Sequence, residues 1–219
     1  IYDAIAKTKT NPEAVLLEPV SKNTSASITI SALHIHQKDP NAIILVVPSD
    51  HLIESKSKFN DHIKKISQNL HKDFIYVFGV KPKIPSTSFG YIKIGKEISS
   101  YIHKVDKFIE KPNLKNAKKY FADNKFYWNA GMFLFSAETL IREMKIHSKK
   151  TLEICERLLK KKSKHYEFTN FPKSLFNTIK NEQFDTALIK KTAKAIVTPI
   201  DYKWFDIGSW SGYWEAFKK

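Results

Sequence analysis

The sequence predicts an α/β fold in which helices alternate with the strands of a central sheet. Residues 43–47 are a run of β-branched and aliphatic side chains, typical of a strand buried on both faces. Residues 56–70 carry apolar side chains at helical spacing, and residues 74–80 again have the composition of a strand. Such alternation builds a parallel sheet through right-handed crossovers.

A polar loop separates the first predicted strand, residues 14–17, from the first predicted helix. Asn23 or Thr24 can cap this helix, and Asp39-Pro40 ends it. A strand, a loop with a carboxylate and a helix N-terminus directed at that loop would suit a nucleotide. The same pattern also fits an ordinary capped helix, so by itself it does not define a site.

Asp50 follows the strand of residues 43–47 directly, after Pro48 and Ser49. In open α/β sheets, ligands bind just beyond the carboxyl ends of the strands. Ser49-Asp50 could equally cap the next helix. Asp50 is therefore a candidate whose importance depends on whether later motifs share its pocket.

The middle of the chain supplies further candidates at strand ends. Gly90 lies in a loop rich in proline and glycine, where it would let a ligand approach the backbone or simply form a turn. Residues 105–112 alternate apolar and polar side chains and deliver Glu110 and Lys111 side by side. Asn129, in an aromatic-rich turn, can donate to and accept from a sugar hydroxyl, or close its own turn.

The last third of the chain is predicted to be mainly helical. We expect two helices within residues 137–162, a short helix at residues 184–190 and a strand at residues 195–200, and we assign no structure to residues 163–176. Asp206 then follows in a tight, aromatic-framed loop, and Ser211 is expected to cap a final helix.

The composition restricts the class of protein. The 219 residues carry a net charge of +15, but only two are arginines and the lysines are scattered, which argues against nucleic-acid binding as the reason for the charge. One cysteine permits no internal disulfide, which favours a reducing, cytoplasmic compartment. No apolar run is long enough for a membrane span. The chain does not begin with Met, which suggests a fragment or a trimmed chain.

Six motifs resemble one known family in their order and spacing, over about residues 14–214. They are Glu-Pro-Val-Ser-Lys-Asn-Thr, Val-Pro-Ser-Asp-His, Phe-Gly-Tyr-Ile, Phe-Ile-Glu-Lys-Pro, Trp-Asn-Ala-Gly-Met-Phe and Trp-Phe-Asp-Ile-Gly-Ser-Trp. The chain thus resembles bacterial mannose-1-phosphate guanylyltransferases, also called GDP-mannose pyrophosphorylases. The resemblance implies a Rossmann-like nucleotidyltransferase core with a mixed, mostly parallel sheet flanked by helices.

The resemblance also implies a reaction in which GTP and mannose 1-phosphate give GDP-mannose and pyrophosphate with Mg²⁺ as cofactor. Asp50 and Asp206 match the metal-binding aspartates, and Lys111 matches the lysine that grips the sugar phosphate, so these three are the expected catalytic residues. If Asp50 and Asp206 share one hydrated Mg²⁺, their carboxylates should lie within roughly 10 Å of each other.

The remaining matched positions are expected to bind the substrates. Around the sugar these are Gly90, Glu110, Lys111, Asn129 and Gly131. Around the base they are Glu18, Pro19, Asn23 and Thr24, where a Glu18 carboxylate could accept both N1–H and N2–H of guanine.

One departure from the family pattern limits the expected activity. We expect a single nucleotidyltransferase domain over residues 1–219, without the family's N-terminal glycine-rich loop segment and without any C-terminal β-helix or cupin-like domain. That loop surrounds the triphosphate with backbone N–H groups. Alternatives are a relative that uses another sugar phosphate or nucleotide, an inactive fragment, and a basic nucleic-acid binder. The sequence leaves a homo-oligomer open.

Overall fold

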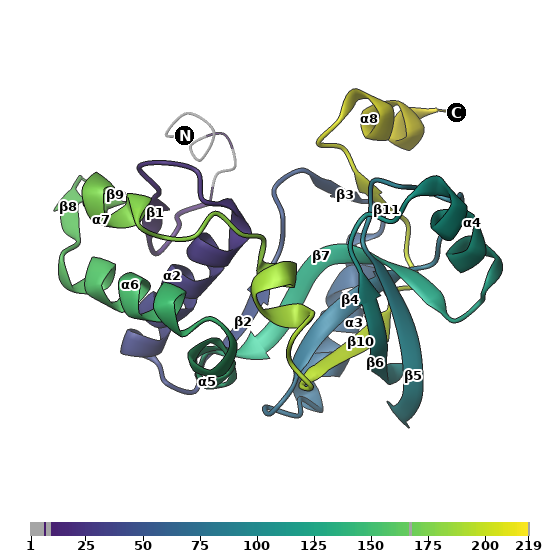
Figure 1. Cartoon of the computed structure of the whole chain (residues 1–219), viewed down its shortest axis with the longest axis horizontal. Helices are drawn as coiled ribbons and strands as arrows, with labels where there is room; N and C mark the ends of the chain where they lie inside the picture. The colour runs from purple at the N-terminus through teal and green to yellow at the C-terminus, as the bar shows by residue number, and fades with distance from the viewer. Residues whose placement is uncertain (1–6, 8–9, 167, 219) are drawn as a thin grey trace.

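The computed structural model describes residue 7, residues 10–166 and residues 168–218. Its main sheet has the strand order β2 (Ile43–Val46), β7 (Phe126–Ser136), β4 (Ile75–Val80), β10 (Ala195–Pro199), β6 (Ile102–Ile109) and β5 (Tyr91–Ser99). Figure 1 shows this sheet on one side of the molecule, and helices α2 (Asn23–Lys38), α5 (Ala137–His147), α6 (Lys149–Lys160) and α7 (Lys173–Asn177) on the other.

The sheet is mixed, as predicted, but its neighbouring strands are mainly antiparallel. Within the described strands of this sheet, only β4 and β10 form a parallel pair. The expectation of mostly parallel pairing is wrong because β7 lies between β2 and β4 and runs antiparallel to both. A strand inserted in this way separates strands that the crossover pattern would otherwise pair directly.

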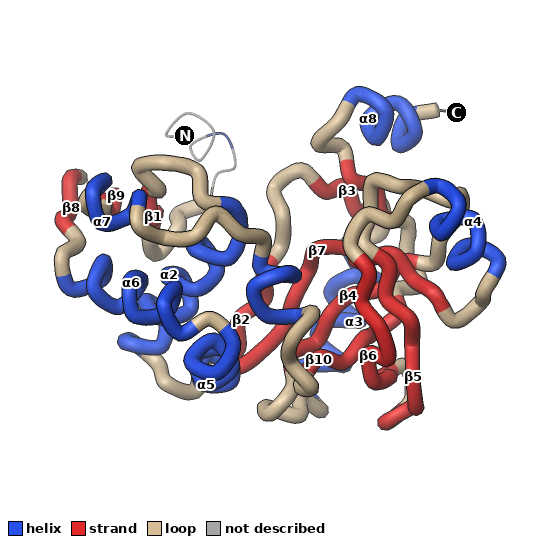
Figure 2. Tube along the Cα trace, in the orientation of Figure 1, coloured by secondary structure: helices blue, strands red, loops and turns tan. Residues whose placement is uncertain are grey.

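Two small sheets accompany the main one. Residues 163–176, which the sequence left unassigned, contain β8 (Ser163–His165) and β9 (Phe168–Asn170), and β9 pairs with β1 (Val15–Leu17). A second small sheet joins β3 (His51–Ile53) to β11 (Trp204–Asp206). Figure 2 shows β3 just above the main sheet.

The strand buried on both faces is β4 rather than β2. Ile75 to Phe78 are completely inaccessible to solvent, whereas Ile43 in β2 is 38% exposed and Val47, just beyond it, is 52% exposed. Among the described strands β2 pairs only with β7, so it is an edge strand. The predicted burial of residues 43–47 is therefore corrected, because apolar composition alone does not distinguish an edge strand from a central one.

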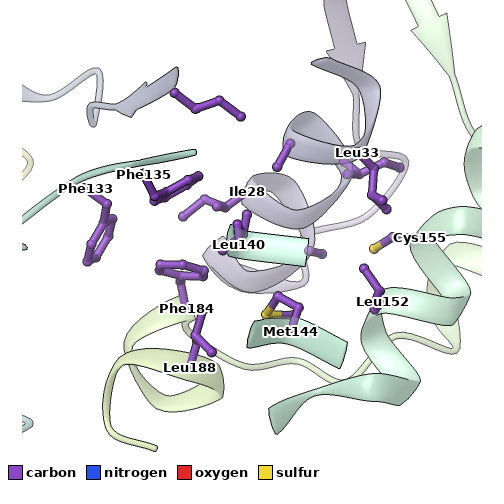
Figure 3. Packing of buried hydrophobic residues seen from close by; sticks show 14 of the residues in the cluster. Ile28, Leu33, Phe133, Phe135, Leu140, Met144, Leu152, Cys155, Phe184 and Leu188 are labelled. Atoms are coloured by element: carbon purple, nitrogen blue, oxygen red, sulfur yellow. The ribbon is translucent and has the colours of Figure 1, made fainter. Parts of the chain in front are cut away.

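Each face of the sheet has its own hydrophobic cluster. Ile75 and Val77 of β4 point to the cluster formed with α2, α5 and α6, and Tyr76 and Phe78 point to the cluster formed with α3 (Lys56–Gln68) and α4 (Leu114–Ala122). Figure 3 shows part of the first cluster, in which Phe184 lies close to Phe133 and Phe135. The chain before η1 (Asp185–Ile189), a short π-helix, is thereby packed onto the sheet.

Two helix caps differ from the sequence predictions. Helix α2 begins at Asn23 after Lys22 and has no side-chain cap, since Asn23 and Thr24 bond to another part of the chain. Helix α8 (Trp210–Phe217) is capped by Ser209, whose side chain accepts from the Gly212 N–H, and the predicted cap position, residue 211, lies within the helix. Within the described part of the chain, no helix is both long and apolar enough to cross a membrane.

Phe184 provides a test of this packing. Its ring centroid lies 4.9 Å from that of Phe133, and the side chain is fully buried. We expect Phe184→Ala to lower the free energy of unfolding by about 3–5 kcal/mol, since a large cavity would remain. Ile146→Ala is the control, because Ile146 is 66% exposed on α5 and should change that free energy by less than about 0.5 kcal/mol. Urea denaturation measures both, and equal effects would contradict the packing argument.

Candidate active site

The loops that carry Asp50 and Asp206 are joined by backbone pairing. Strand β3 begins just after Asp50, strand β11 ends at Asp206, and the two pair antiparallel with Asp206 opposite His51. The Ile207 N–H also donates to the Asp50 carbonyl at 2.9 Å. Two carboxylates that are 156 positions apart in the sequence are thus held at one place.

Gly208 shows how close these carboxylates are. Its N–H donates to Asp206 Oδ1 at 2.9 Å. A Cβ added at Gly208 would overlap Asp50 Oδ2 and would lie 3.1 Å from Asp206 Oδ1. Both carboxylate oxygens therefore lie close to the same point, and the predicted convergence of Asp50 and Asp206 is confirmed. Glycine is required here because any side chain would occupy the space between them.

His51 is a neighbour of this pair that the sequence presented only as part of a motif. Its Nδ1 accepts from Trp204 Nε1 at 3.1 Å, which leaves the proton of the neutral ring on Nε2. Burial lowers the pKa of His51, although the charges of Asp206 and Asp50 act in the opposite direction. The lowered pKa favours the neutral imidazole, which offers an N–H donor beside the carboxylates.

A second polar cluster lies next to the first and is built around Asn129 on β7. The Asn129 N–H donates to the Gly90 carbonyl at 2.8 Å. A Cβ at Gly90 would lie 3.0 Å from Glu110 Oε2 and 3.5 Å from the Asn129 Cβ. Gly90, Glu110 and Asn129, which the resemblance assigned to the sugar, are thus brought together.

Gly131 connects the two clusters. Its N–H donates to Asn129 Oδ1 at 3.2 Å, and its φ of +67° lies in the left-handed region that favours glycine. A Cβ at Gly131 would lie 3.7 Å from Pro48 Cγ and 3.8 Å from His51 Cε1. Three consecutive residues of β7 therefore extend from the Glu110 cluster to the loop that carries Asp50.

Lys111 follows Glu110 at the end of β6 and is exposed. Its φ of +41° is unusual for a residue with a side chain and turns the chain sharply before Pro112. Within the described part of the chain its ammonium takes part in no ion pair. An ammonium without an ion-pair partner among the described residues is available to an anionic ligand.

Asp185 is a member of the second cluster that the sequence did not predict. Its Oδ1 accepts from Asn129 Nδ2 at 2.7 Å. Burial, followed by the nearby charge of Glu110, raises the pKa of Asp185 to about 6. The sequence offered no signal for this role, since Asp185 lay only at the start of a predicted short helix.

The residues expected at the base lie around the start of α2. Thr24 Oγ1 accepts from the Phe184 N–H at 2.9 Å, and Asn23 Nδ2 donates to Asn181 Oδ1. Glu18 is exposed just after β1, and Pro19 follows it. No hydrogen bond or ion pair between described residues joins Glu18 or Pro19 to the two clusters, whereas Thr24 is joined through Phe184 to the segment that carries Asp185.

The chemistry of the first cluster suits a hard divalent cation. In the described residues no three side chains of His, Cys, Asp or Glu form a metal site, so Asp50 and Asp206 stand as a carboxylate pair. Mg²⁺ commonly takes one or two carboxylates, keeps several waters and completes its shell with phosphate oxygens. The carboxylate pair fits Mg²⁺ bound together with a phosphorylated ligand.

Comparison with known proteins defines the class. The sequence model of the nucleotidyl transferase family matches residues 3–219. The chain therefore belongs to the nucleotidyl transferase family.

The curated proteins to which the chain is similar have more specific names than the family does. A mannose-1-phosphate guanylyltransferase of Escherichia coli is 35% identical over 211 residues, which are 94% of this chain and 46% of that protein. Xanthan biosynthesis protein XanB of Xanthomonas campestris is 34% identical over 200 residues, 91% of this chain and 42% of that protein. The chain thus spans less than half the length of these relatives.

Solved structures confirm the fold. A Helicobacter pylori protein described as a mannose-6-phosphate isomerase is 32% identical, with a TM-score of 0.82 over 93% of this chain and 78% of that one. A Thermus thermophilus protein described as a mannose-1-phosphate geranyltransferase has a TM-score of 0.85 at 22% identity, over 99% of this chain and 62% of that one. Because the Thermus thermophilus protein is only 22% identical to this chain, its similarity shows the fold alone.

Proposed function

We propose that this chain carries the metal-binding and sugar-binding parts of a nucleotidyl-transfer site for joining GMP from GTP to mannose 1-phosphate, with pyrophosphate as the second product. The observation that supports this most is the convergence of Asp50 and Asp206 around Gly208, directly beside the Asn129 cluster. A cation-binding pair beside a group of hydrogen-bonding side chains suits a nucleotide phosphate next to a sugar. The relatives named mannose-1-phosphate guanylyltransferase support the choice of substrates.

The proposed mechanism follows from the charges involved. An oxygen of the sugar phosphate attacks the α-phosphorus of GTP in line, and pyrophosphate leaves. Asp50 and Asp206 would hold Mg²⁺, which would supply positive charge to neutralise that of the phosphates. Lys111 would hold the sugar phosphate, since its ammonium has no ion-pair partner among the described residues. His51 would donate its Nε2 proton in a hydrogen bond to a phosphate oxygen.

The sugar and the base would be bound by different parts of the chain. Glu110 and Asn129 would bond the hydroxyls of the sugar, while Gly90 and Gly131 leave space for it beside the backbone. Around the base, Glu18 would accept from guanine, Pro19 would contact its edge, and Asn23 and Thr24 would shape the entry to the site through their bonds to residues 181–184.

We further propose that residues 1–219 form a single nucleotidyltransferase domain that acts in the cytoplasm. The family match over residues 3–219 supports a single domain. The single cysteine, which is buried, supports a reducing compartment. The proposed partners are GTP and mannose 1-phosphate, without a membrane or a nucleic acid, and a homo-oligomer is compatible with this function.

A second candidate is isomerisation of mannose 6-phosphate, because the similar Helicobacter pylori protein is described as an isomerase. The two functions differ in the ligands that they require. Guanylyl transfer needs a nucleotide and a sugar 1-phosphate, whereas isomerisation needs only a sugar 6-phosphate.

The metal pair provides the main test of the proposed function. We expect Mg²⁺ to increase the affinity of the wild-type chain for GTP. Asp206→Asn should reduce the affinity measured with Mg²⁺ by at least about tenfold, because a charged ligand contributes roughly 1.5–3 kcal/mol. Asp201→Asn is the control, since Asp201 is an exposed carboxylate whose ion pair with Lys58 spans 3.8 Å. Calorimetric titration with and without Mg²⁺ measures the effect. Unchanged GTP affinity, or conversion of mannose 6-phosphate to its ketose, would contradict the proposal.

Substitution of Glu18 tests whether this residue recognises the guanine base. We expect Glu18→Gln to weaken GTP binding by about ten- to hundredfold and ATP binding much less, because one partner of a charge-assisted hydrogen bond is removed. Glu13→Gln serves as the matched control, since Glu13 is exposed and pairs with Lys38 at 2.6 Å. Equal losses for GTP and ATP would show that Glu18 does not recognise guanine.

Turnover should be absent when the 219-residue chain is assayed alone. Its six glycines form no glycine-rich loop that could surround a triphosphate. Removing one preorganised hydrogen-bond donor lowers a reaction rate about 10²–10³-fold, and a glycine-rich loop would supply several such donors. We expect no GDP-mannose from GTP, mannose 1-phosphate and Mg²⁺. Product formed at about 1 s⁻¹, an ordinary enzymatic rate, would disprove this prediction.

A further inference from the structure

Asp185 is a carboxylate for which the proposed function has no role so far. It is partly buried at the start of η1, and its Oδ1 accepts from Asn129 Nδ2 at 2.7 Å. Glu110 faces it from the end of β6, and Lys190 approaches from the end of η1. None of the ion pairs between described residues includes Asp185. A partly buried carboxylate beside another carboxylate, without an ion-pair partner among the described residues, is unfavourable for folding.

The backbone around Asp185 holds it firmly in this unfavourable place. The Ser25 N–H donates to the Glu182 carbonyl at 3.2 Å, and the Phe184 N–H donates to Thr24 Oγ1 at 2.9 Å. The buried ring of Phe184 packs on Phe133. Asp185 then opens a π-helix, a rare conformation that often occurs at functional sites.

Asp185 determines which way the Asn129 amide points. Asn129 Nδ2 donates to Asp185, and Asn129 Oδ1 accepts from the Gly131 N–H at 3.2 Å. One N–H of the Asn129 amide and further lone pairs of the Asp185 carboxylate remain for a ligand. The Asp185 and Glu110 carboxylates thus offer several hydrogen-bond acceptors, and the Asn129 amide offers one donor. Such a group suits several hydroxyl groups rather than a phosphate.

We propose that Asp185 is a sugar-recognition residue of this site, which accepts a hydrogen bond from a hydroxyl of a hexose 1-phosphate and orients Asn129 to bind another. The inference rests on the proposed function, because that function places the sugar beside Glu110 and Asn129. It adds to that function a residue 56 positions from Asn129 in the sequence, on a different element.

Stability and binding should respond in opposite directions if Asp185 has this role. Burial raises the pKa of Asp185 from 3.8 to about 6, so the folded state holds the proton more tightly than the unfolded state does. Its ionisation therefore lowers stability as the pH rises through this interval. At pH 7 we expect Asp185→Asn to have the same melting temperature as the wild type or a higher one. A residue needed only for folding would show a clear decrease.

The experiment compares the wild-type chain with Asp185→Asn by calorimetric titration at pH 5–8. The probes are mannose 1-phosphate, glucose 1-phosphate and inorganic phosphate. We expect the variant to bind a hexose 1-phosphate about ten- to hundredfold more weakly at pH 7 and inorganic phosphate equally well. Asp123→Asn, at the half-buried C-cap position of α4, is the control. Asp185→Ser is a second variant in case the amide rearranges the cluster.

The pH profile separates Asp185 from the ligand. The phosphate group of the ligand titrates near pH 6 as well, but it does so equally with both proteins. The ratio of wild-type to variant affinity should therefore fall as the pH decreases through about 6, where Asp185 takes up a proton. A ratio that is constant from pH 5 to 8 would overturn the inference.

The outcomes also separate this inference from the proposed function. Equal binding of mannose 1-phosphate by wild type and variant would overturn the role of Asp185 and leave the proposed function intact. Asp185-dependent binding of glucose 1-phosphate alone would retain the inference and overturn the choice of mannose. A lower melting temperature with parallel loss of all three ligands, inorganic phosphate included, would assign Asp185 a purely structural role.

Discussion

Strand β7 is the element on which the arrangement of the site depends. It runs antiparallel between β2 and β4, and its apolar side chains enter the hydrophobic clusters on both faces of the sheet. Such packing leaves β7 little freedom to shift. Its polar residue Asn129 is consequently fixed between Gly90 and Asp185, and Gly131 is fixed beside Pro48 and His51. The two polar clusters keep their relative positions because one rigid strand contributes to both.

The electrostatics of the site contrast with those of the whole chain. The protein has a net charge of +15, but the site gathers the carboxylates of Asp50, Asp206, Glu110 and Asp185. Two of them converge and suit a cation, and the other two face an amide and suit hydroxyl groups. A reaction between two phosphorylated substrates needs positive charge at the phosphates. In the proposed function, the carboxylate pair would supply this charge indirectly through a bound cation, and Lys111 would supply it directly.

Several features were predictable because they depend on local sequence. The helices at residues 137–162 and the strand β10 were predicted close to their observed positions, since apolar spacing determines which face an element can bury. The meeting of Asp50 and Asp206 was predictable from motifs that resemble a known family. The burial of β2 was not, because composition does not show whether a strand has one neighbour or two. The cap of α2 was also missed, because Asn23 and Thr24 bond to residues about 160 positions away.

The sequence by itself therefore determined the α/β class, the order of most elements and the identity of the carboxylates at the ends of strands. Only the tertiary structure decided that β7 separates β2 from β4, that His51 lies against Trp204, and that Asp185 reaches Asn129. The physical reason is the range of the interactions concerned. Hydrophobic periodicity acts between residues a few positions apart, whereas strand pairing and buried hydrogen bonds join distant segments whose meeting depends on how the whole core packs.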